Sequence, residues 1–497
     1  MTDSTRQVHW SGSALLAFSR VWVQVTGAVL FLAVSVALEP SEFGEFAIAA
    51  SIYSALALIV GHGVYEYVMK MHDSPTAPVT GFFLNMASAA VTACLAIAIS
   101  FFLTPLLKTE VVGHLLRLLA PAFFLQGCNT LMESVLMRRG QVGTVAILTM
   151  AADTLGLGVA VAFLGFGAGA LALVIQRLSR EAVLTGAFAL SRRWEMRFAF
   201  DFQEAKQILR FAQNIIMARG IGAGAAAITD LFIGTALSVA DAGLFRLANR
   251  LVSLGTDILF QPFRSALWVR LPPLRQNPTA FARATLEMTE VFGVGLFAVI
   301  GGMAVTASAA LPLVLGQKWQ GAVPVVCALA IGRLVSMPNS SAEAVLALRD
   351  RVRFMVVSSI WGSILTLAAI VISAPYGIIW CGVAVAVAGL LSQFYILPVL
   401  AQCCGLKILD FIKLMLRLTA NALVMALVVV PWLMLGDRLG LHAWLLVGSA
   451  ILAGAIAYAF AARRFTRLGY SAYEAPLLET FRRAKRLLMG QRPELSS

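Results

Sequence analysis

Charged residues are scarce in this chain. Only 13% of its 497 residues are charged, whereas 60% are hydrophobic, and the mean hydropathy is +0.85. A soluble domain needs roughly 25% charged residues, so a soluble globular protein is excluded. About fourteen apolar runs, each roughly 20 to 28 residues long, are long enough to cross a bilayer as helices. The sequence predicts an all-α polytopic membrane protein, with runs that start near Gly12, Phe43, Val79, His114, Val142, Gly167, Ile208, Ala240, Thr289, Val323, Phe354, Gly377, Phe411 and Leu441.

Residues that commonly perform catalysis or bind metals are also scarce. The five histidines are scattered, and the six cysteines lack the spacing of metal ligands. No Walker A lysine motif is present, and no outer loop is long enough to hold a sugar against a carboxylate pair. We therefore predict neither an enzyme nor a metalloprotein, and we predict no cofactor.

The net charge of +13 is distributed as in a membrane protein, not as in a nucleic-acid-binding protein. With the N-terminus placed in the cytoplasm, the outer turns hold only Lys108, Lys318 and Arg438, while the inner segments hold most of the other arginines and lysines. This asymmetry predicts that both termini are cytoplasmic. The first apolar run is too long for the hydrophobic region of a signal peptide, so we expect no cleavable signal.

Part of the sequence is an internal repeat. Residues 38–46 resemble residues 237–245, and the same offset matches Arg20 to Arg219. Residues 129–136 likewise resemble residues 339–346. Duplicated halves with charge at matched positions are typical of transporters built around a pseudo-symmetric central site. The predicted organisation is an N-lobe of six helices (1–191), a basic cytoplasmic linker (192–207), a C-lobe of six helices (208–402), two added helices (403–462) and a basic cytoplasmic tail (463–497).

Arginine dominates the ionisable residues within the apolar runs. Such residues are costly at membrane depth and usually line a cavity or pair with one another. A guanidinium stays charged and offers forked donors that fit phosphate oxygens. We therefore predict that Arg20, Arg219 and Arg333 bind an anionic, phosphate-bearing substrate. Salt bridges to carboxylates or snorkelling to the inner surface remain the structural alternatives for Arg20 and Arg219.

The carboxylates of the apolar runs have a second set of predicted roles. Glu133 and Glu343 occupy matched sites, each four residues after an asparagine, Asn129 or Asn339. These four residues are predicted to serve ion coupling or gating, with Arg138 and Arg349 as candidate gate partners for the glutamates. Asp153, alone in its apolar run, is the best single candidate for ion coupling. Asp230 is predicted to form a structural charge pair with Arg246 or Arg250.

Three segments carry a resemblance to a known family. Residues 38–44, 230–248 and 315–319 resemble turns and helix starts of the polysaccharide-specific transport family, the Wzx-type flippases of the multidrug/oligosaccharidyl-lipid/polysaccharide (MOP) exporter superfamily. The similarity runs over about residues 10 to 400. One departure is Phe245-Arg246, where the family commonly has a small or polar residue after the aromatic.

The resemblance implies two six-helix lobes arranged in a V, as in MATE and other MOP proteins, with two further helices. It also implies alternating access that moves undecaprenyl-diphosphate-linked oligosaccharide from the cytoplasmic to the outer leaflet of a bacterial inner membrane, for exopolysaccharide, lipopolysaccharide or capsule synthesis. The implied driving force is a proton or sodium gradient. Membrane lipids are expected partners, as is a polysaccharide polymerase or export machinery, although nothing in the tail identifies one. A lipid II flippase, a multidrug antiporter and a non-transporting scaffold are the alternatives.

Overall fold

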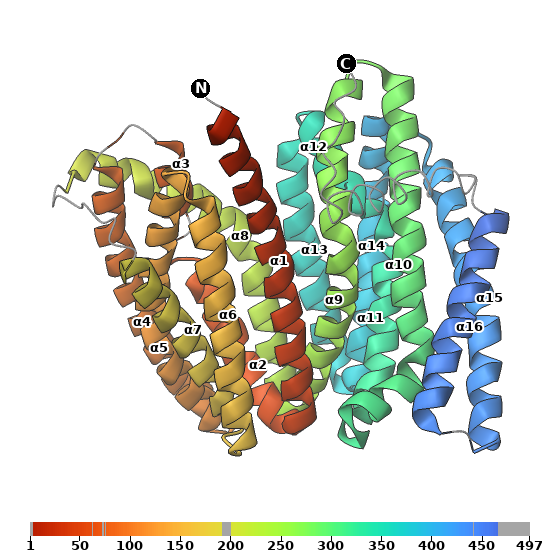
Figure 1. The fold of residues 1–497 in the computed structure, drawn as a ribbon. Helices are drawn as coiled ribbons and strands as arrows, with labels where there is room; N and C mark the ends of the chain where they lie inside the picture. Colours follow the sequence, from red (N-terminus) through yellow and green to blue (C-terminus); the bar gives the residue numbers. More distant parts are fainter. Residues whose placement is uncertain are drawn as a thin grey trace. The chain divides into compact units, whose positions relative to one another are not determined.

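The chain folds entirely as helices over the residues that the computed structural model describes, which are 3–61, 63–71, 74, 76–190, 200–440 and 442–465 (Figure 1). No strand occurs in these ranges. An all-helical fold follows from the long apolar runs, because a helix satisfies every backbone hydrogen bond within the segment itself. The predicted fold class, an all-α polytopic membrane protein, is confirmed.

The helices follow one another with short connections. The helices up to the middle of the chain are α1 (Asp3–Ala37), α2 (Pro40–Ala57), α3 (Val64–Lys70), α4 (Ala77–Leu107), α5 (Val111–Arg138), α6 (Val142–Gly165), α7 (Leu171–Leu190) and α8 (Phe202–Ala236). The later ones are α9 (Val239–Arg270), η1 (Pro272–Leu274), α10 (Pro278–Leu315), η2 (Gln317–Ala322), α11 (Val323–Val335), η3 (Met337–Ser341), α12 (Ala342–Leu348), α13 (Val352–Ser373), η4 (Ala374–Tyr376), α14 (Ile378–Cys404), α15 (Ile408–Arg438) and α16 (Ala443–Phe465).

Each predicted apolar run coincides with a helix or with a group of consecutive helices. Within the described ranges, ten helices are long and apolar enough to cross a membrane, and eleven if the two parts of α8, bent by 48°, count as one span. The runs that fall short include α2, with Glu42 and Glu45 in its first turns, and α7 and α9, which each carry several charged residues. The count of fourteen spans therefore stays a prediction.

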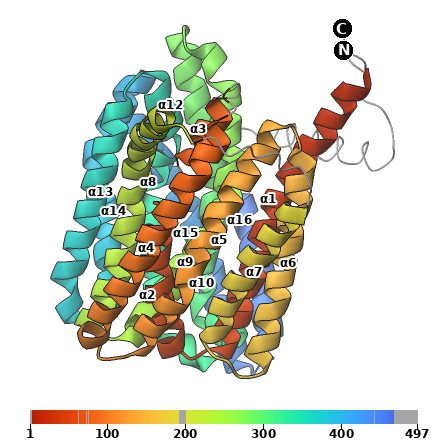
Figure 2. The ribbon, with the colours of Figure 1, turned by 90° about the vertical axis from the view of Figure 1, so that its left-hand side faces the viewer.

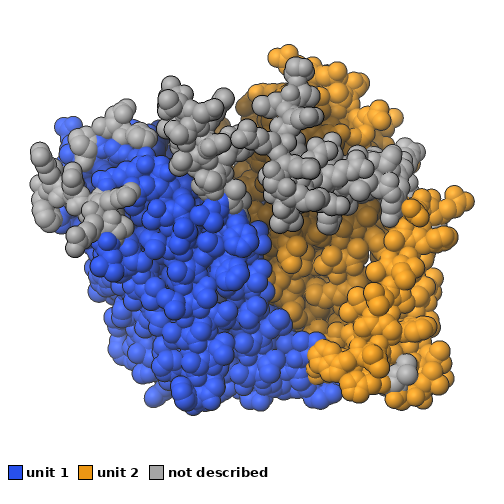
Figure 3. All heavy atoms as spheres, viewed as in Figure 1, with its two compact units in different colours: residues 1–248, 314–322, 359–384 blue, residues 249–313, 323–358, 385–497 orange. Residues whose placement is uncertain are grey.

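Two compact units make up the chain (Figure 3). Unit 1 comprises residues 1–248, 314–322 and 359–384, and unit 2 comprises residues 249–313, 323–358 and 385–497. The predicted boundaries of lobes, linker and tail stay predictions, because residues 192–199 of the linker and 466–497 of the tail lie outside the described residues.

Unit 1 is a bundle of long helices packed side by side (Figures 1 and 2). In this unit α4 packs along α5, α6 packs against both α1 and α7, and α2 packs against α8. The short helix α3 lies against α5 and α8 through Tyr67 and Val68, which contact the buried Leu131 and Ile208. In unit 2, α15 and α16 form an antiparallel pair.

The duplicated turn of the sequence meets its own copy in unit 1. Gly44 lies in the first turns of α2, and its counterpart Gly243 lies in the first turns of α9. A Cβ atom added to Gly44 would lie 1.9 Å from the carbonyl oxygen of Val239, and one added to Gly243 would lie 2.1 Å from that of Pro40. Only glycine permits backbones to approach this closely. The repeat therefore builds a close contact between the starts of α2 and α9.

A third segment, η2, packs beside this contact in unit 1. Trp319 of η2 is fully buried, and its indole nitrogen donates a hydrogen bond to the carbonyl oxygen of Ser35 at 2.6 Å. Its ring packs edge-on against Phe43, with centroids 5.5 Å apart. Two of the segments that carried the family resemblance, residues 38–44 and 315–319, are thus in direct contact.

Candidate functional site

A network of charged side chains connects α5, α6 and α7 inside unit 1. Arg180 of α7 lies between two carboxylates: its Nε atom is 2.5 Å from Asp153 and its Nη1 atom is 2.9 Å from Glu181. Arg177, one turn earlier on α7, contacts the same Glu181 at 3.2 Å. Both carboxylates are buried, with exposed fractions of 8% for Asp153 and 3% for Glu181. Two guanidinium groups thus balance two carboxylates, as buried charge requires.

Hydrogen bonds attach this network to α5. The amide nitrogen of Asn129 donates to a carboxylate oxygen of Glu181 at 2.8 Å, and the Thr185 hydroxyl donates to the amide oxygen of Asn129 at 2.8 Å. The predicted coupling residues Asn129 and Asp153 are therefore both parts of one buried network. Asp153 thus has an arginine partner within this network.

The residues at the centre of this network have no role predicted from the sequence. Arg177, Arg180 and Glu181 all lie in the apolar run that starts near Gly167. The spacing held a signal that could have identified them, since Arg177 and Glu181 are four residues apart and share a helix face. The partner of Arg180 could not be found in this way, because Asp153 is on another helix.

The short helix α3 gathers a second group of polar residues in unit 1. Gly63 precedes α3 with φ of 88°, a left-handed conformation that favours glycine. Its backbone N–H donates to the Glu66 carboxylate at 2.7 Å, which holds the first turn of α3. The other oxygen of Glu66 forms an ion pair with Arg219 of α8 at 3.0 Å. The predicted substrate residue Arg219 is thus half-exposed, at 52%, and already has one carboxylate partner.

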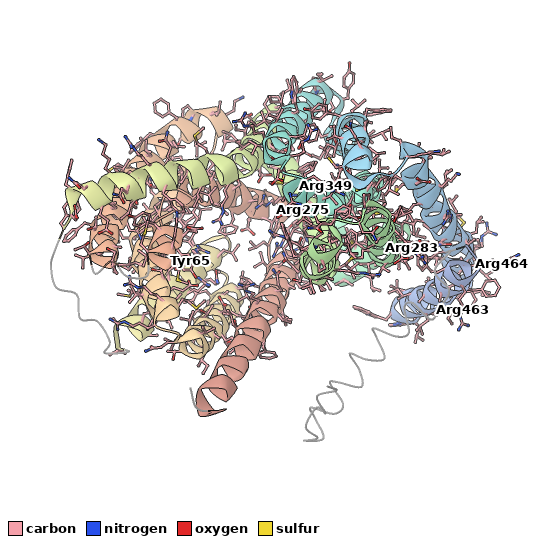
Figure 4. The ribbon with its side chains drawn as sticks, turned by 90° about the horizontal axis from the view of Figure 1, so that it is seen from above. Tyr65, Arg275, Arg283, Arg349, Arg463 and Arg464 are labelled. Atoms are coloured by element: carbon pink, nitrogen blue, oxygen red, sulfur yellow. The ribbon has the colours of Figure 1, made fainter. Side chains whose placement is uncertain are left out.

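Arg20 of α1 and Glu133 of α5 lie near the same helix, α3. Arg20 and Glu133 both act electrostatically on Tyr65 of α3, and they attract each other. Tyr65 is labelled in Figure 4. Within the part of the chain that the structure describes, Arg20 makes no ion pair, and no hydrogen bond or ion pair reaches the Glu133 carboxylate. The structure therefore brings Arg20, Glu133 and Arg219 to one short helix that sequence analysis did not predict.

This group of residues, Arg20, Tyr65, Glu66, Glu133 and Arg219, is called the α3 cluster below. It offers a guanidinium without an ion pair, a phenol hydroxyl and a carboxylate at one place. A guanidinium and a hydroxyl can both donate hydrogen bonds to phosphate oxygens. The carboxylate can take up a proton or bind a cation. The cluster thus has the chemistry needed to bind an anion and to respond to a coupling ion.

Asp230 of α8 and Arg246 of α9 form an ion pair at 3.0 Å. Asp230 is almost completely buried, at 3% exposed. Removal of one partner would leave a buried charge, so this pair fastens α8 to the first turns of α9. Arg250 belongs to unit 2 and has contacts of its own.

The predicted site residues of unit 2 are dispersed. Arg333 of α11 is exposed, and its Nε atom donates to the Thr256 hydroxyl at 3.3 Å. Glu343 of α12 forms an ion pair with Arg264 of α9 at 2.7 Å, with both side chains partly exposed. The amide oxygen of Asn339 is buried and has no hydrogen-bond partner among the described residues. Pro338 interrupts the helix here, so Asn339 lies in η3 and Glu343 in α12.

The two candidate gate arginines contact backbone, not the glutamates. Arg138 donates to the carbonyl oxygen of Ser74 at 3.1 Å. Arg349 donates to the carbonyl oxygen of Cys403 at 3.0 Å. Arg138 therefore contacts the segment at Ser74, and Arg349 contacts the last turn of α14. No group of three or more possible metal ligands occurs in the described ranges.

The whole-chain comparison with solved structures defines the class of protein. A MurJ lipid II flippase in an inward closed conformation aligns with a TM-score of 0.72 and 13% identity, over 91% of this chain and 99% of that chain. An inward-facing multidrug resistance MATE transporter of the MOP superfamily aligns with a TM-score of 0.65 and 15% identity, over 77% and 94% of the two chains. The protein has the fold of MOP-superfamily transporters and is a multi-pass membrane protein.

The family follows from the sequence itself. The model of the polysaccharide biosynthesis protein family matches residues 37–324, and the chain belongs to that family. Its relatives include the succinoglycan biosynthesis transport protein ExoT of Rhizobium meliloti (strain 1021), 27% identical over 61% of this chain and 62% of ExoT. Another is the teichuronic acid biosynthesis protein TuaB of Bacillus subtilis (strain 168), 22% identical over 59% of this chain and 61% of TuaB. The matches thus span about three fifths of the length of each relative.

Proposed function

We propose that this protein is a flippase that moves undecaprenyl-diphosphate-linked oligosaccharide from the cytoplasmic to the outer leaflet of the bacterial inner membrane. The product serves the synthesis of an exported polysaccharide. Membership of the polysaccharide biosynthesis family and similarity to the transport protein ExoT support the polysaccharide. The shared fold with MurJ supports a lipid-linked substrate. Both termini are cytoplasmic in this proposal, as the distribution of positive charge predicts.

The observation that carries the proposal is the state of Arg20. It lies in an apolar span, Phe18–Ala37, and makes no ion pair within the described ranges. An arginine in a membrane span is costly, and its retention marks a pathway for a charged substrate by default. The negative charge that balances Arg20 is the diphosphate of the substrate in this proposal. Tyr65 and Arg219 supply further donors to the same group.

Transport is driven by a proton or sodium gradient in this proposal, and Glu133 is the residue that binds the coupling ion. Asp153 suits this role less well, because Arg180 already contacts it at 2.5 Å. Glu133 has no hydrogen-bonded or ion-paired partner among the described residues, and the guanidinium groups of Arg180 and, more weakly, Arg20 act on it only through the field of their charges. Binding of a cation at Glu133 would weaken its attraction for Arg20 and leave the guanidinium to the diphosphate.

The test is the leaflet distribution of the lipid-linked oligosaccharide in cells that lack this protein but keep the enzymes that synthesise it. Right-side-out and inverted membrane vesicles are treated with a membrane-impermeant glycosidase that cleaves the exposed oligosaccharide. The proposal predicts that completed oligosaccharide accumulates on the cytoplasmic leaflet and that the wild-type gene restores its export. An unchanged distribution in the deletion strain would refute the flippase function.

A matched pair of variants then tests the site. Arg20→Gln removes the guanidinium of the α3 cluster, and it is expected not to restore export. Arg283→Gln removes a guanidinium that is 84% exposed and pairs with Glu287 at the end of unit 2, and it is expected to restore export fully. Both variants must reach the membrane in equal amounts, measured by immunoblot. Full export with Arg20→Gln would show that Arg20 is not part of the substrate site. The proposed flippase function would not be affected by this result.

A further inference from the structure

One end of unit 2 contains a cavity of about 370 Å³. It lies among Pro278 at the start of α10, Arg349 and Arg351 just after α12, and the last turn of α14 with Gly405 behind it. Figure 4 views this end from above and labels Arg349 together with Arg275 and Arg283. Two arginines line the cavity, and no carboxylate does.

Arg349 is held rigidly at the wall of this cavity. Its Nε atom donates to the carbonyl oxygen of Cys403 at 3.0 Å, and its guanidinium carbon lies 4.5 Å from the centre of the Phe281 ring. Its Nη1 atom is 3.4 Å from the carbonyl oxygen of Arg275. Its Nη2 atom donates no hydrogen bond to any described residue. A guanidinium fixed in this way loses little conformational entropy when it binds a ligand.

Arg351 provides the second positive charge and has no partner in the described ranges. Its side chain is exposed and makes neither a hydrogen bond nor an ion pair there. Asp350, between the two arginines in sequence, does not line the cavity and pairs with Arg275. The carboxylate nearest to these arginines in the sequence, that of Asp350, therefore pairs with a residue outside the cavity.

The helix ends around the cavity do not cancel this positive charge. The last carbonyl groups of α14 would repel an anion, but three of them already accept hydrogen bonds: Ala401 from Leu406, Gln402 from Gly405, and Cys403 from Arg349. The start of α10 at Pro278 presents the positive end of a helix dipole. The cavity therefore combines two guanidinium groups with a favourable dipole and capped carbonyls.

We infer that this cavity binds the phosphate-bearing headgroup of an anionic glycerophospholipid from the adjoining leaflet, through Arg349 and Arg351. Basic pockets at the cytoplasmic ends of transmembrane helices are typical sites for such headgroups. Earlier turns of α14 expose apolar positions, such as Leu391 and Phe394, that suit contact with acyl chains. This inference does not depend on the proposed transport activity.

The test measures lipid binding by the purified full-length protein in a neutral detergent. Native mass spectrometry counts bound dioctanoyl-phosphatidylglycerol, with dioctanoyl-phosphatidylcholine, which is zwitterionic and has no net charge, as the comparison. One arginine near a phosphate contributes about 1 kcal/mol, so Arg351→Gln is expected to weaken phosphatidylglycerol binding about fivefold. Arg351→Lys keeps the charge and is expected to retain most of the affinity. Phosphatidylcholine binding is expected to be weak and unchanged in all variants.

Arg283→Gln is the matched control, because Arg283 has the same charge at the same end of unit 2 but does not line the cavity. An equal loss with Arg283→Gln and Arg351→Gln would show that diffuse surface charge binds the lipid, and the site would be rejected. Displacement of phosphatidylglycerol by millimolar inorganic diphosphate would show a site for soluble phosphate compounds, which would also overturn the lipid assignment. Because Arg349 holds two backbone carbonyls, its substitution is left out of the test.

Discussion

The two copies of the repeat carry the same residue types at matched positions, but unit 1 and unit 2 use them differently. In unit 1, Asn129 lies on the continuous helix α5 and hydrogen-bonds to the buried Glu181, while Glu133 has no bonded partner in the described part of the chain. In unit 2, the amide oxygen of Asn339 is unpaired, and Glu343 pairs with Arg264 near the surface.

The cause of this difference is the break in the second copy. Pro338 lacks a backbone N–H and interrupts the helix, so that Asn339 and Glu343 fall in two separate elements. The first copy has no proline at the corresponding place, and Asn129 and Glu133 stay one turn apart on one face. The comparison teaches that the two copies share residue types, whereas only the first copy places its asparagine in a hydrogen bond with a buried carboxylate.

The largest loss of stability is expected from a substitution at the centre of the charged network in unit 1. Arg180→Gln leaves Asp153 and Glu181 buried with less compensation, which is expected to lower the free energy of unfolding by about 3 to 5 kcal/mol. The measurement is denaturant unfolding in mixed micelles. The control in unit 2 is Arg333→Gln, whose one hydrogen bond to Thr256 at 3.3 Å predicts a loss of about 1 kcal/mol or less. Equal losses for the two variants would refute the contrast between the units.

A smaller effect is expected where the duplicated turns meet. Gly44→Ala or Gly243→Ala places a methyl group against a backbone carbonyl, so each is expected to destabilise the protein by about 1 to 3 kcal/mol. Gly222→Ala is the control, because a Cβ atom at this position of α8 meets nothing within 4 Å. It is expected to be neutral or slightly stabilising, since alanine favours a helix by about 0.5 to 1 kcal/mol. If Gly44→Ala behaved like Gly222→Ala in thermal unfolding, the close contact of α2 and α9 would be disproved.

The smallest effect is expected for the ion pair of Glu343 and Arg264. Because the two side chains are 38% and 46% exposed, water screens the pair. A double-mutant cycle with Glu343→Gln and Arg264→Gln is expected to give a coupling energy of about 0 to 1 kcal/mol. A coupling energy above 2 kcal/mol would show that unit 2 also depends on a tightly coupled charge pair.

The fold could be predicted from the sequence, because the signal is local. The apolar runs fix the helices, and the repeat at residues 38–46 and 237–245 fixes the turns that meet at Gly44 and Gly243. The break at Pro338 was also present in the sequence, but the match of residues 129–136 to 339–346 concealed it.

The candidate site could be predicted only in part, because its contacts join distant segments. The repeat and the apolar runs selected Arg20, Arg219 and Glu133, but they did not show that these residues lie near α3, which is part of a longer apolar run. The partners of Asp153 and Glu343 are residues on other helices, 27 and 79 positions away. The periodicity of a helix relates residues three or four positions apart, so it cannot predict contacts between residues this far apart in the sequence.

The most direct test of the central claim is transport by the purified protein alone. Proteoliposomes are prepared with undecaprenyl-diphosphate-linked oligosaccharide in the inner leaflet, and its arrival in the outer leaflet is followed with an impermeant glycosidase. The account predicts transport by the wild type and by Arg283→Gln, with a rate at least about tenfold lower for Arg20→Gln, the loss expected for a charged hydrogen bond to the diphosphate. No transport by the wild type under either a proton or a sodium gradient would contradict it.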